Sequence, residues 1–340
     1  MREILRHLIT VVATFCLLVL SCEHAIGQVR KGAAAYGGWQ DDKPEVRRLR
    51  RPEDASLVAR PTYAVAQVVR MDDRALRYAP DGLSVQLVMS KLHMPRVIRL
   101  APNGDLFVLD SLFNTVRALR IRAGTRKPTR REVFPSGLQP PFGIAFYLLG
   151  STQHRIHIAN SDGGVRIALS ADGNRLFLSV GSGSNAPKNT FPEPPLTVHP
   201  APRIATCLRN CDGISYGWPW YYMGGREGPR LAGARPALIG NVTIPEVLMP
   251  AQSAPLQMVF YQRGNISSGY QGSAFAAMDG SWNRGKRTGE YEDFMTGSVP
   301  SDGGGWGCPV GVAVAKNGAL LETEDGNGTI WRVTYGKNIR

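Results

Sequence analysis

The 340-residue sequence contains almost no run of apolar residues at helical spacing, which argues against a helical fold. After residue 27, no segment has the length and apolarity needed to cross a membrane as a helix. Glycine (38 residues) and proline (24 residues) are abundant instead, and this balance favours short strands joined by turns. We therefore expect an all-β protein with no transmembrane segment beyond its N-terminal region.

Cysteine is scarce, with five residues in the chain. Cys207 and Cys211 have C-x₃-C spacing, and a disulfide across so short a loop is awkward to close. No further ligands of the right kind stand nearby to make a metal site with them. Cys308 has no obvious partner. We interpret these cysteines as incidental and predict no metal site from them.

Around residues 120–131 the sequence also lacks an aromatic platform or a nucleic-acid motif, although its formal net charge is +13. One basic cluster lies within residues 31–51 and a second within residues 120–131. The second surrounds a turn-like stretch that holds Gly124 and Pro128. We interpret it as a solvated basic loop, and we expect no nucleic-acid partner.

Residues 1–27 resemble an export signal, because basic residues precede the apolar run 8–20, which is too short to span a membrane. Cleavage after this segment would release the mature chain. Alternatively, residues 19–22 (VLSC) resemble a lipoprotein box, in which Cys22 becomes the lipidated N-terminus. Both alternatives predict an exported, periplasmic protein, and the second predicts a lipid anchor at Cys22.

Residues 28–80 show little periodicity and contain four scattered prolines, so we expect an irregular lead-in there. The ordered domain is expected to begin near residues 83–88 and to occupy residues 81–336. A segment of roughly 250 residues is long enough to bury one large core.

One stretch near the C-terminal end predicts three strands joined by tight turns. Residues 310–314 alternate valine with small residues, so one face of that strand is apolar. Asn317 and Gly318 follow, and this pair is a strong hairpin signal because both residues tolerate positive φ. A polar turn then leads to a third strand at residues 329–333.

Similar hairpins recur along the chain. Their turn glycines are Gly104, Gly173 and Gly318, which are 69 and 145 residues apart. These gaps correspond to one and two units of about 70 residues. Repeated small sheets that pack on their neighbours favour a β-propeller over an ordinary antiparallel sandwich with common turns.

Eight stretches, in order, resemble the soluble quinoprotein glucose/sorbosone dehydrogenases. They are residues 94–108, 141–146, 179–185, 208–210, 217–219, 253–256, 280–284 and 306–333. The resemblance covers roughly residues 80 to 335. It implies a six-bladed β-propeller, here with shortened or incomplete blades, that holds pyrroloquinoline quinone (PQQ) and Ca²⁺ at the mouth of its central channel.

The resemblance also implies an oxidoreductase activity. A sugar hydroxyl or aldehyde hydrate would be oxidised by hydride transfer to the quinone, while a histidine takes the hydroxyl proton. Two electrons would then pass to an external acceptor. The expected partners are therefore a sugar substrate and an electron acceptor.

Carried over residue by residue, the resemblance implies five cofactor-binding positions. Arg209 and Asn210 match the family's Arg-Asn pair, and an arginine beside a quinone carbonyl would stabilise the charge that develops on reduction. Asn283 and Arg284 fall near the expected cofactor carboxylates. Gln252 lies in a cofactor-facing stretch where relatives have His or Thr.

The sequence departs from this family at the position of the base. In relatives, the base histidine lies on a loop that is missing here, and no histidine occurs between His157 and His199. His157 is flanked by Ile156 and Ile158 within an expected strand. We therefore interpret His157 as a structural or solvent-facing residue, and we assign no residue as the catalytic base.

The cofactor and calcium positions depart as well. Only residues 211–216 separate the Arg-Asn pair from residues 217–219, where relatives have a long segment with acidic calcium-associated residues. Asp212 alone remains, whereas calcium takes about six to eight oxygen ligands. Cys308 stands where relatives have the arginine of a Trp-Gly-Arg-Pro motif. A further shortening within residues 287–294 removes an expected strand pair.

Two functions follow from the sequence. The first is a PQQ-dependent sugar dehydrogenase of the glucose/sorbosone type. The alternative is an inactive propeller that serves as a binding module and has lost the base histidine and the calcium site. A lactonase-type propeller would require several inward carboxylates and a base, and the sequence shows no such set.

Overall fold

The structure is a computed structural model. It describes residues 29–36, 43–50, 68–72, 75–122, 125, 127–134, 137–149, 153–160, 166–169, 176–179, 204–207, 220–222, 226–228, 231–242, 255–278, 289–298 and 305–336. The expected signal segment and Cys22 lie outside these residues, so export and lipidation stay predictions. No helix in the described ranges is long and apolar enough to cross a membrane.

The described chain is nearly all β, as the sequence predicts, with short 3₁₀ turns in place of α-helices. The strands are β1 (Arg47–Arg50), β2 (Leu83–Met89), β3 (Pro95–Leu100), β4 (Leu106–Asp110), β5 (Thr115–Arg120), β6 (Arg130–Val133), β7 (Pro141–Leu149), β8 (Gln153–Asn160), β9 (Arg166–Leu169), β10 (Leu176–Ser179), β11 (Ile204–Cys207), β12 (Tyr221–Tyr222), β13 (Arg226–Glu227), β14 (Pro255–Phe260), β15 (Ala274–Met278), β16 (Gly289–Glu292), β17 (Pro309–Val314), β18 (Leu320–Glu324) and β19 (Thr329–Tyr335). The turns are η1 (Gly32–Tyr36), η4 (Ser111–Phe113), η5 (Pro236–Asn241) and η6 (Ser268–Tyr270).

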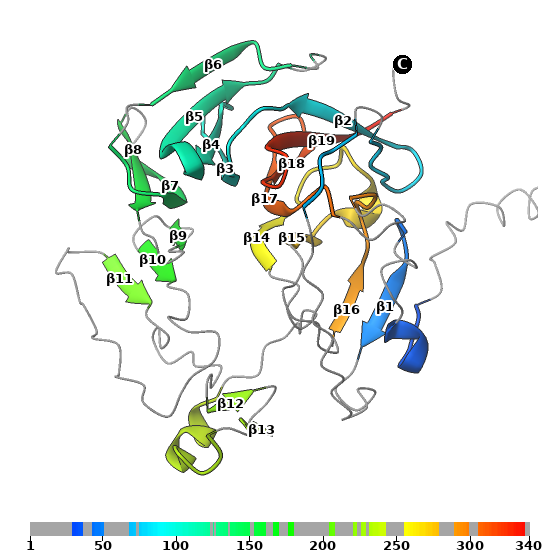
Figure 1. The fold of residues 1–340 in the computed structure, drawn as a ribbon, viewed down its shortest axis with the longest axis vertical. Coiled ribbons are helices and arrows are strands. Elements are labelled where there is room, and N and C mark those ends of the chain that lie inside the picture. Colours follow the sequence, from blue (N-terminus) through cyan, green and yellow to red (C-terminus); the bar gives the residue numbers. More distant parts are fainter. Residues whose placement is uncertain are drawn as a thin grey trace, which may run out of the picture.

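The strands form small sheets that follow one another in chain order from β3 to β11 (Figure 1). Two sheets have four strands, in the orders β3-β4-β5-β6 and β17-β18-β19-β2. The pairs β7-β8, β12-β13, β14-β15 and β1-β16 and the three-stranded sheet β11-β10-β9 complete the set. Neighbouring strands are antiparallel except β10 and β11. The three predicted C-terminal strands are confirmed as β17, β18 and β19.

Strand β2 belongs to the last sheet, although it is the first strand of the expected domain. It pairs with β19 so that Val85 lies opposite Val333 and Leu83 lies opposite Tyr335. The beginning and the end of this domain are thus joined by main-chain hydrogen bonds, which ties β2 into the C-terminal sheet.

Strand β17 is buried on both faces, whereas the alternation in its sequence predicted one apolar face. Val310, Gly311, Val312 and Ala313 are all buried. A Cβ atom at Gly311 would collide with the Thr323 side chain and with the backbone of β3. Glycine therefore lets β17 lie directly against β3, and the second face is covered by that neighbour.

The hydrophobic core lies between successive sheets. One cluster joins the β17–β19/β2 sheet to the β3–β6 sheet, and its members are Val88, Leu92, Ile98, Leu106, Val108, Leu119, Ala313, Leu321 and Ile330. A second lies between the β3–β6 sheet and β7, and its members are Val97, Ala101, Phe107, Leu109, Val116, Ala118 and Ile144. The third joins β14 and β15 to the C-terminal sheet, and its members are Tyr261, Ile266, Phe275, Ala277, Val312, Leu320 and Val333. The sheets that contribute to these clusters thus stabilise one another.

A buried glutamine links three of these sheets. The Gln257 side chain, on β14, donates from Nε2 to the carbonyl oxygens of Ile98 (2.8 Å) and Val312 (2.6 Å). Its Oε1 accepts from the Ile98 N–H at 3.3 Å. Because Ile98 lies on β3 and Val312 on β17, this one side chain satisfies main-chain groups of two neighbouring sheets.

Parts of the expected irregular lead-in pack against the domain. Strand β1 pairs with all four residues of β16, close to the place where the sequence is shortened. Arg48, within the first basic cluster, is fully buried and forms an ion pair with Asp293. Arg77 is also buried and forms an ion pair with Glu322. These arginines are therefore part of the folded unit and do not add to an exposed basic surface.

The second basic cluster is partly neutralised by acidic neighbours. Arg120 donates two hydrogen bonds of 2.6 Å to Asp105, and these bonds hold the pKa of the Asp105 carboxyl below its usual value. Arg130 forms an ion pair with Glu132 on β6, a strand that is exposed throughout. The absence of a nucleic-acid partner stays a prediction.

Candidate functional site

The five expected cofactor-binding residues lie outside the described part of the chain. They are Arg209, Asn210, Gln252, Asn283 and Arg284. Asp212, the remnant of the expected calcium segment, and His199 lie outside it too. Their roles stay predictions, and the described site is built from other residues.

His157 lies on β8, as the sequence predicts, and its side chain is partly buried. Its ring packs edge-on against Tyr147 of β7, with 6.1 Å between the ring centroids. This cross-strand packing agrees with the interpretation of His157 as a structural residue.

The beginnings of β3 and β17 lie side by side at one end of their sheets. The Thr323 hydroxyl, on β18, donates to the Arg96 carbonyl oxygen at 3.1 Å. The Arg96 guanidinium lies 3.2 Å from the carboxylate of Asp325, which begins the turn between β18 and β19. Charged residues of two neighbouring sheets therefore meet at this end.

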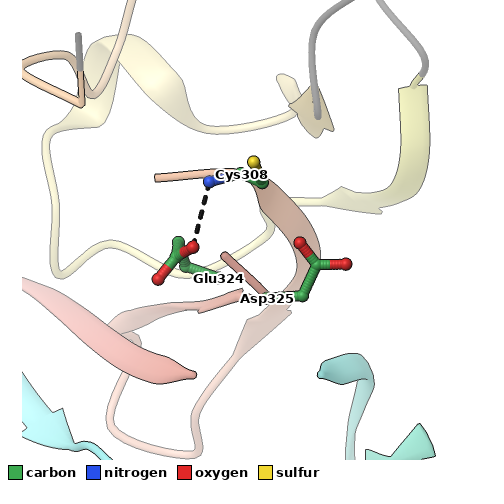
Figure 2. Close-up of side chains that lie close together, drawn as sticks. All are labelled: Cys308, Glu324 and Asp325. Atoms are coloured by element: carbon green, nitrogen blue, oxygen red, sulfur yellow. Dashed lines mark hydrogen bonds between the residues drawn. The ribbon is translucent and has the colours of Figure 1, made fainter. Parts of the chain in front are cut away.

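A cluster of three potential metal ligands forms at the same end (Figure 2). Cys308 comes directly before β17, Glu324 ends β18 and Asp325 follows it. One ligand atom from each residue lies within 4.8 Å of the others. Figure 2 shows that the Cys308 N–H reaches the Glu324 carboxylate, a hydrogen bond of 3.1 Å. The antiparallel pairing of β17 with β18 brings the cysteine beside the two acids.

Glu324 is fully buried and serves as an acceptor for the turn that follows it. Besides the Cys308 N–H, its carboxylate accepts from the Asn327 N–H at 2.9 Å and from the Thr329 hydroxyl at 2.9 Å. Neutral donors therefore surround this carboxylate and fix the β18–β19 turn in place. Gly328 completes the turn with a positive φ of 65°, and a side chain there would collide with the Leu92 backbone.

The fold is similar to those of two solved structures. The holo form of the pyranose dehydrogenase PQQ domain from Coprinopsis cinerea matches with a TM-score of 0.54 and 16% identity, over 80% of this chain and 100% of that domain. The calcium structure of a Trichoderma reesei carbohydrate-active enzyme of family AA12 matches with a TM-score of 0.51 and 14% identity, over 79% of this chain and 100% of the enzyme. At such identities the likeness shows the fold alone.

Sequence comparisons are less informative. The chain matches no protein-family model. An uncharacterized protein of Borreliella burgdorferi is 31% identical over 105 residues, which cover 26% of this chain and 28% of that protein. The chain thus spans little more than a quarter of this relative's length, and the match indicates no activity.

The cluster of Cys308, Glu324 and Asp325 does not fit a calcium ion. Calcium takes six to eight oxygen ligands, and this cluster supplies only two carboxylates. Glu324 is already bonded to three donors, and Asp325 is paired with Arg96. A thiol is a soft ligand that suits other metals better than calcium. The Cys308 thiol also cannot offer the charge-assisted paired hydrogen bonds with which an arginine holds a cofactor carboxylate.

His93 is a residue at this end that the sequence did not single out. It precedes β3 by two residues, and its main-chain N–H donates to the buried Asp110 carboxylate at 2.7 Å. Its ring lies 4.0 Å, centroid to centroid, from that of Phe113, which is half exposed. The Nδ1 atom of His93 is buried and has no hydrogen-bond partner in the described structure. No sequence motif marks this histidine, because its setting depends on the η4 turn that packs against it.

Proposed function

We propose that the chain is an exported, PQQ-dependent sugar dehydrogenase of the glucose/sorbosone type, built on a six-bladed β-propeller with shortened blades. The observation that carries the proposal is the fold similarity to the PQQ domain of a pyranose dehydrogenase over 80% of the chain. The protein would oxidise a sugar hydroxyl or aldehyde hydrate in the periplasm and pass two electrons to an external acceptor. It would remain free there or be anchored through a lipidated Cys22.

The order of contacts between strands supports a ring of sheets. Strand β14 contacts β17, β17 contacts β3, β3 contacts β7 and β7 contacts β9. These are the first strands of five sheets or hairpins, and each touches the next. The short β12-β13 pair lies between β9 and β14 in the sequence, where a sixth and reduced blade would fall. The pairing of β2 with β19 would close the last blade.

In this proposal, PQQ supplies the electron sink when it is bound, with Ca²⁺ beside it. Arg209 would stabilise the charge that develops on the quinone, while the neighbouring Asn210 orients it. Gln252, Asn283 and Arg284 would contact the cofactor's polar groups. The calcium ligands would come from outside the Cys308 cluster, because that cluster does not fit the ion.

His93 is our candidate for the missing proton acceptor. It lies at the end of the sheets where β3 and β17 begin, and the residue is only partly buried. The half-exposed Phe113 ring beside it offers an apolar face on which a sugar ring could stack. A histidine ring at this position could accept a hydroxyl proton from a sugar stacked on Phe113.

The alternative function is an inactive propeller that binds a ligand without turnover. Cys308 favours it, since a thiol replaces the expected cofactor-binding arginine and lies beside two carboxylates that would repel an anionic cofactor. In this case the end of the sheets around Cys308 would bind a neutral ligand such as a sugar.

Titration of the purified mature chain with PQQ, with and without Ca²⁺, tests the proposal. Cofactor absorbance reports binding, and dye reduction with a panel of aldoses reports turnover. We expect calcium-dependent binding with turnover, and both should be lost in Arg209→Gln but kept in the exposed control Arg131→Gln. Binding without turnover would favour the inactive module, and no PQQ binding would contradict the quinoprotein function.

A further inference from the structure

A second candidate site lies at the opposite end of the C-terminal sheet from Cys308. It is a cleft of about 260 Å³ between the β3–β4 turn and the β17–β18 turn. Its lining comes from the two turns and from side chains of β3, β4, β5, β18 and β19. The length of β18, from Leu320 to Glu324, separates it from the Cys308 cluster by about 13 Å at the usual rise per residue.

Arg332 is the innermost cation of this cleft. It lies in the middle of β19 and only 6% of its surface is exposed. Its Nη2 donates to the neutral Gln86 side chain at 2.7 Å, and its buried Nε has no hydrogen-bond partner in the described chain. None of the described carboxylates forms an ion pair with Arg332. A buried guanidinium without an anion is costly, so an anion that enters the cleft would be stabilised there.

A second cation lies at the mouth of the cleft. Lys316 is exposed on the β17–β18 turn, and its side chain passes over Gly104. A Cβ atom at Gly104 would stand 3.0 Å from the Lys316 chain, and Gly104 has a φ of +92° that favours glycine. Glycine thus gives the lysine room to lie across the entrance.

The balance of charge in the lining favours an anion. Its charged residues are Arg120, Lys316 and Arg332 against the single carboxylate of Asp105, which is a net charge of +2. Asp105 is already bonded to Arg120 by two hydrogen bonds of 2.6 Å. Arg332 and Lys316 are therefore the cations left for a ligand.

The remaining walls are apolar side chains, with Asn103 and Asn317 at the turns. The apolar members are Leu100, Leu106, Ile121, Ala315 and Leu321. We propose that this cleft binds a small amphiphilic carboxylate, with its carboxylate on Arg332 and Lys316 and its hydrocarbon part against the apolar walls. This site is independent of the proposed dehydrogenase function and lies at the other end of the sheets.

Calorimetric titration of the mature chain with octanoate tests the site. We expect saturable binding that weakens at least 10-fold in Arg332→Gln and in Lys316→Gln. Arg131→Gln, which removes an exposed arginine of β6 from outside the cleft, should leave the affinity unchanged. The uncharged analogue octanamide should bind at least 10-fold more weakly than octanoate. Because Lys316 lies on an exposed turn, its variant tests the site even where Arg332→Gln fails to fold.

Three outcomes would overturn the proposal. The first is no heat of binding for octanoate at millimolar concentration. The second is an octanoate affinity that Lys316→Gln leaves unchanged. The third is equal binding of octanoate and octanamide, which would mean that the cations do not recognise the ligand.

Discussion

Cys308 shows how one side chain can decide which ligand charge the end of the sheets around it accepts. Its thiol lies beside Glu324 and Asp325, and Arg96 supplies the neighbouring positive charge. Arg96 is paired with Asp325, and no cation among the described residues forms an ion pair with Glu324. A cation at position 308 would offset the charge of Glu324 and make the site more favourable for an anionic ligand. The geometry therefore makes this position a direct test of cofactor recognition.

We expect Cys308→Arg to tighten PQQ binding by about 10-fold or more. A charge-assisted hydrogen bond to a buried carboxylate is worth about 1.5–3 kcal/mol, which corresponds to roughly 10- to 150-fold. Equilibrium titration by cofactor absorbance measures the change. Cys308→Ser is the matched control, because it removes the thiol without adding a charge and should leave the affinity as it is. Equal affinities for the two variants would rule out a cofactor carboxylate at this position.

The role proposed for His93 gives a second prediction at this scale. His93→Gln should lower the turnover of the best aldose by roughly 10²- to 10⁴-fold, because general-base catalysis is typically worth that much. PQQ binding should change little. His157→Gln is the control, since that ring packs on Tyr147 and has no proposed role in proton transfer. A similar loss in both variants, or a normal pH–rate profile in His93→Gln, would contradict a base at His93.

At the scale of strands and sheets, Gln257 is the side chain that links β14 to β3 and β17. It is 7% exposed, and its side-chain amide forms hydrogen bonds with the N–H and the carbonyl of Ile98 and with the carbonyl of Val312. Gln257→Leu should lower the free energy of unfolding by about 1–3 kcal/mol, because the Ile98 N–H is left buried without a partner.

Urea denaturation of the purified protein measures this loss. Met258→Leu is the control, since Met258 is the next residue on β14 and is half exposed. It should change the unfolding midpoint very little. A Gln257→Leu protein as stable as the Met258→Leu protein would show that the bridge between sheets contributes nothing.

Elements set by local chemistry could be predicted from the sequence. The β17–β18–β19 unit was predictable because the Asn317-Gly318 turn and the valine alternation are both encoded within a few residues. The bridge made by Gln257 was not, because its partners are 159 and 55 residues away along the chain. The pairing of β1 with β16 was missed for the same reason, since Arg47 and Glu292 meet only in the folded chain.

The candidate site was less predictable than the fold. Family motifs pointed to residues such as Arg209, which the described structure does not include. The residues that it does bring together are held by long-range contacts. Cys308 meets Glu324 across a strand pair, and the η4 turn brings Phe113 beside His93. Spacing alone gives no sign of such contacts, and Arg332 likewise resembles any other strand residue until its burial is known.

At the scale of the whole molecule, the N-terminal segment formed by residues 68–72 and 75–80 is part of the folded unit. The guanidinium carbon of Arg77 lies over the rings of both Trp306 and Trp331, 5.1 and 5.2 Å from their centroids. It also forms the buried ion pair with Glu322 of β18. Cation–π contacts and the ion pair together hold this segment against the C-terminal sheet. Residues that precede the expected domain therefore contribute to its stability.

Breaking this contact should destabilise the entire chain. Arg77→Met should lower the free energy of unfolding by about 3–5 kcal/mol, because Glu322 would remain buried without its cation. The double variant Arg77→Met/Glu322→Leu should regain a large part of the loss, since no unpaired charge is then left inside. Arg70→Met, which removes an exposed arginine of the same segment, is the control and should be nearly neutral. Urea denaturation measures all three. An Arg77→Met protein as stable as Arg70→Met would show that the contacts of Arg77 contribute nothing to stability.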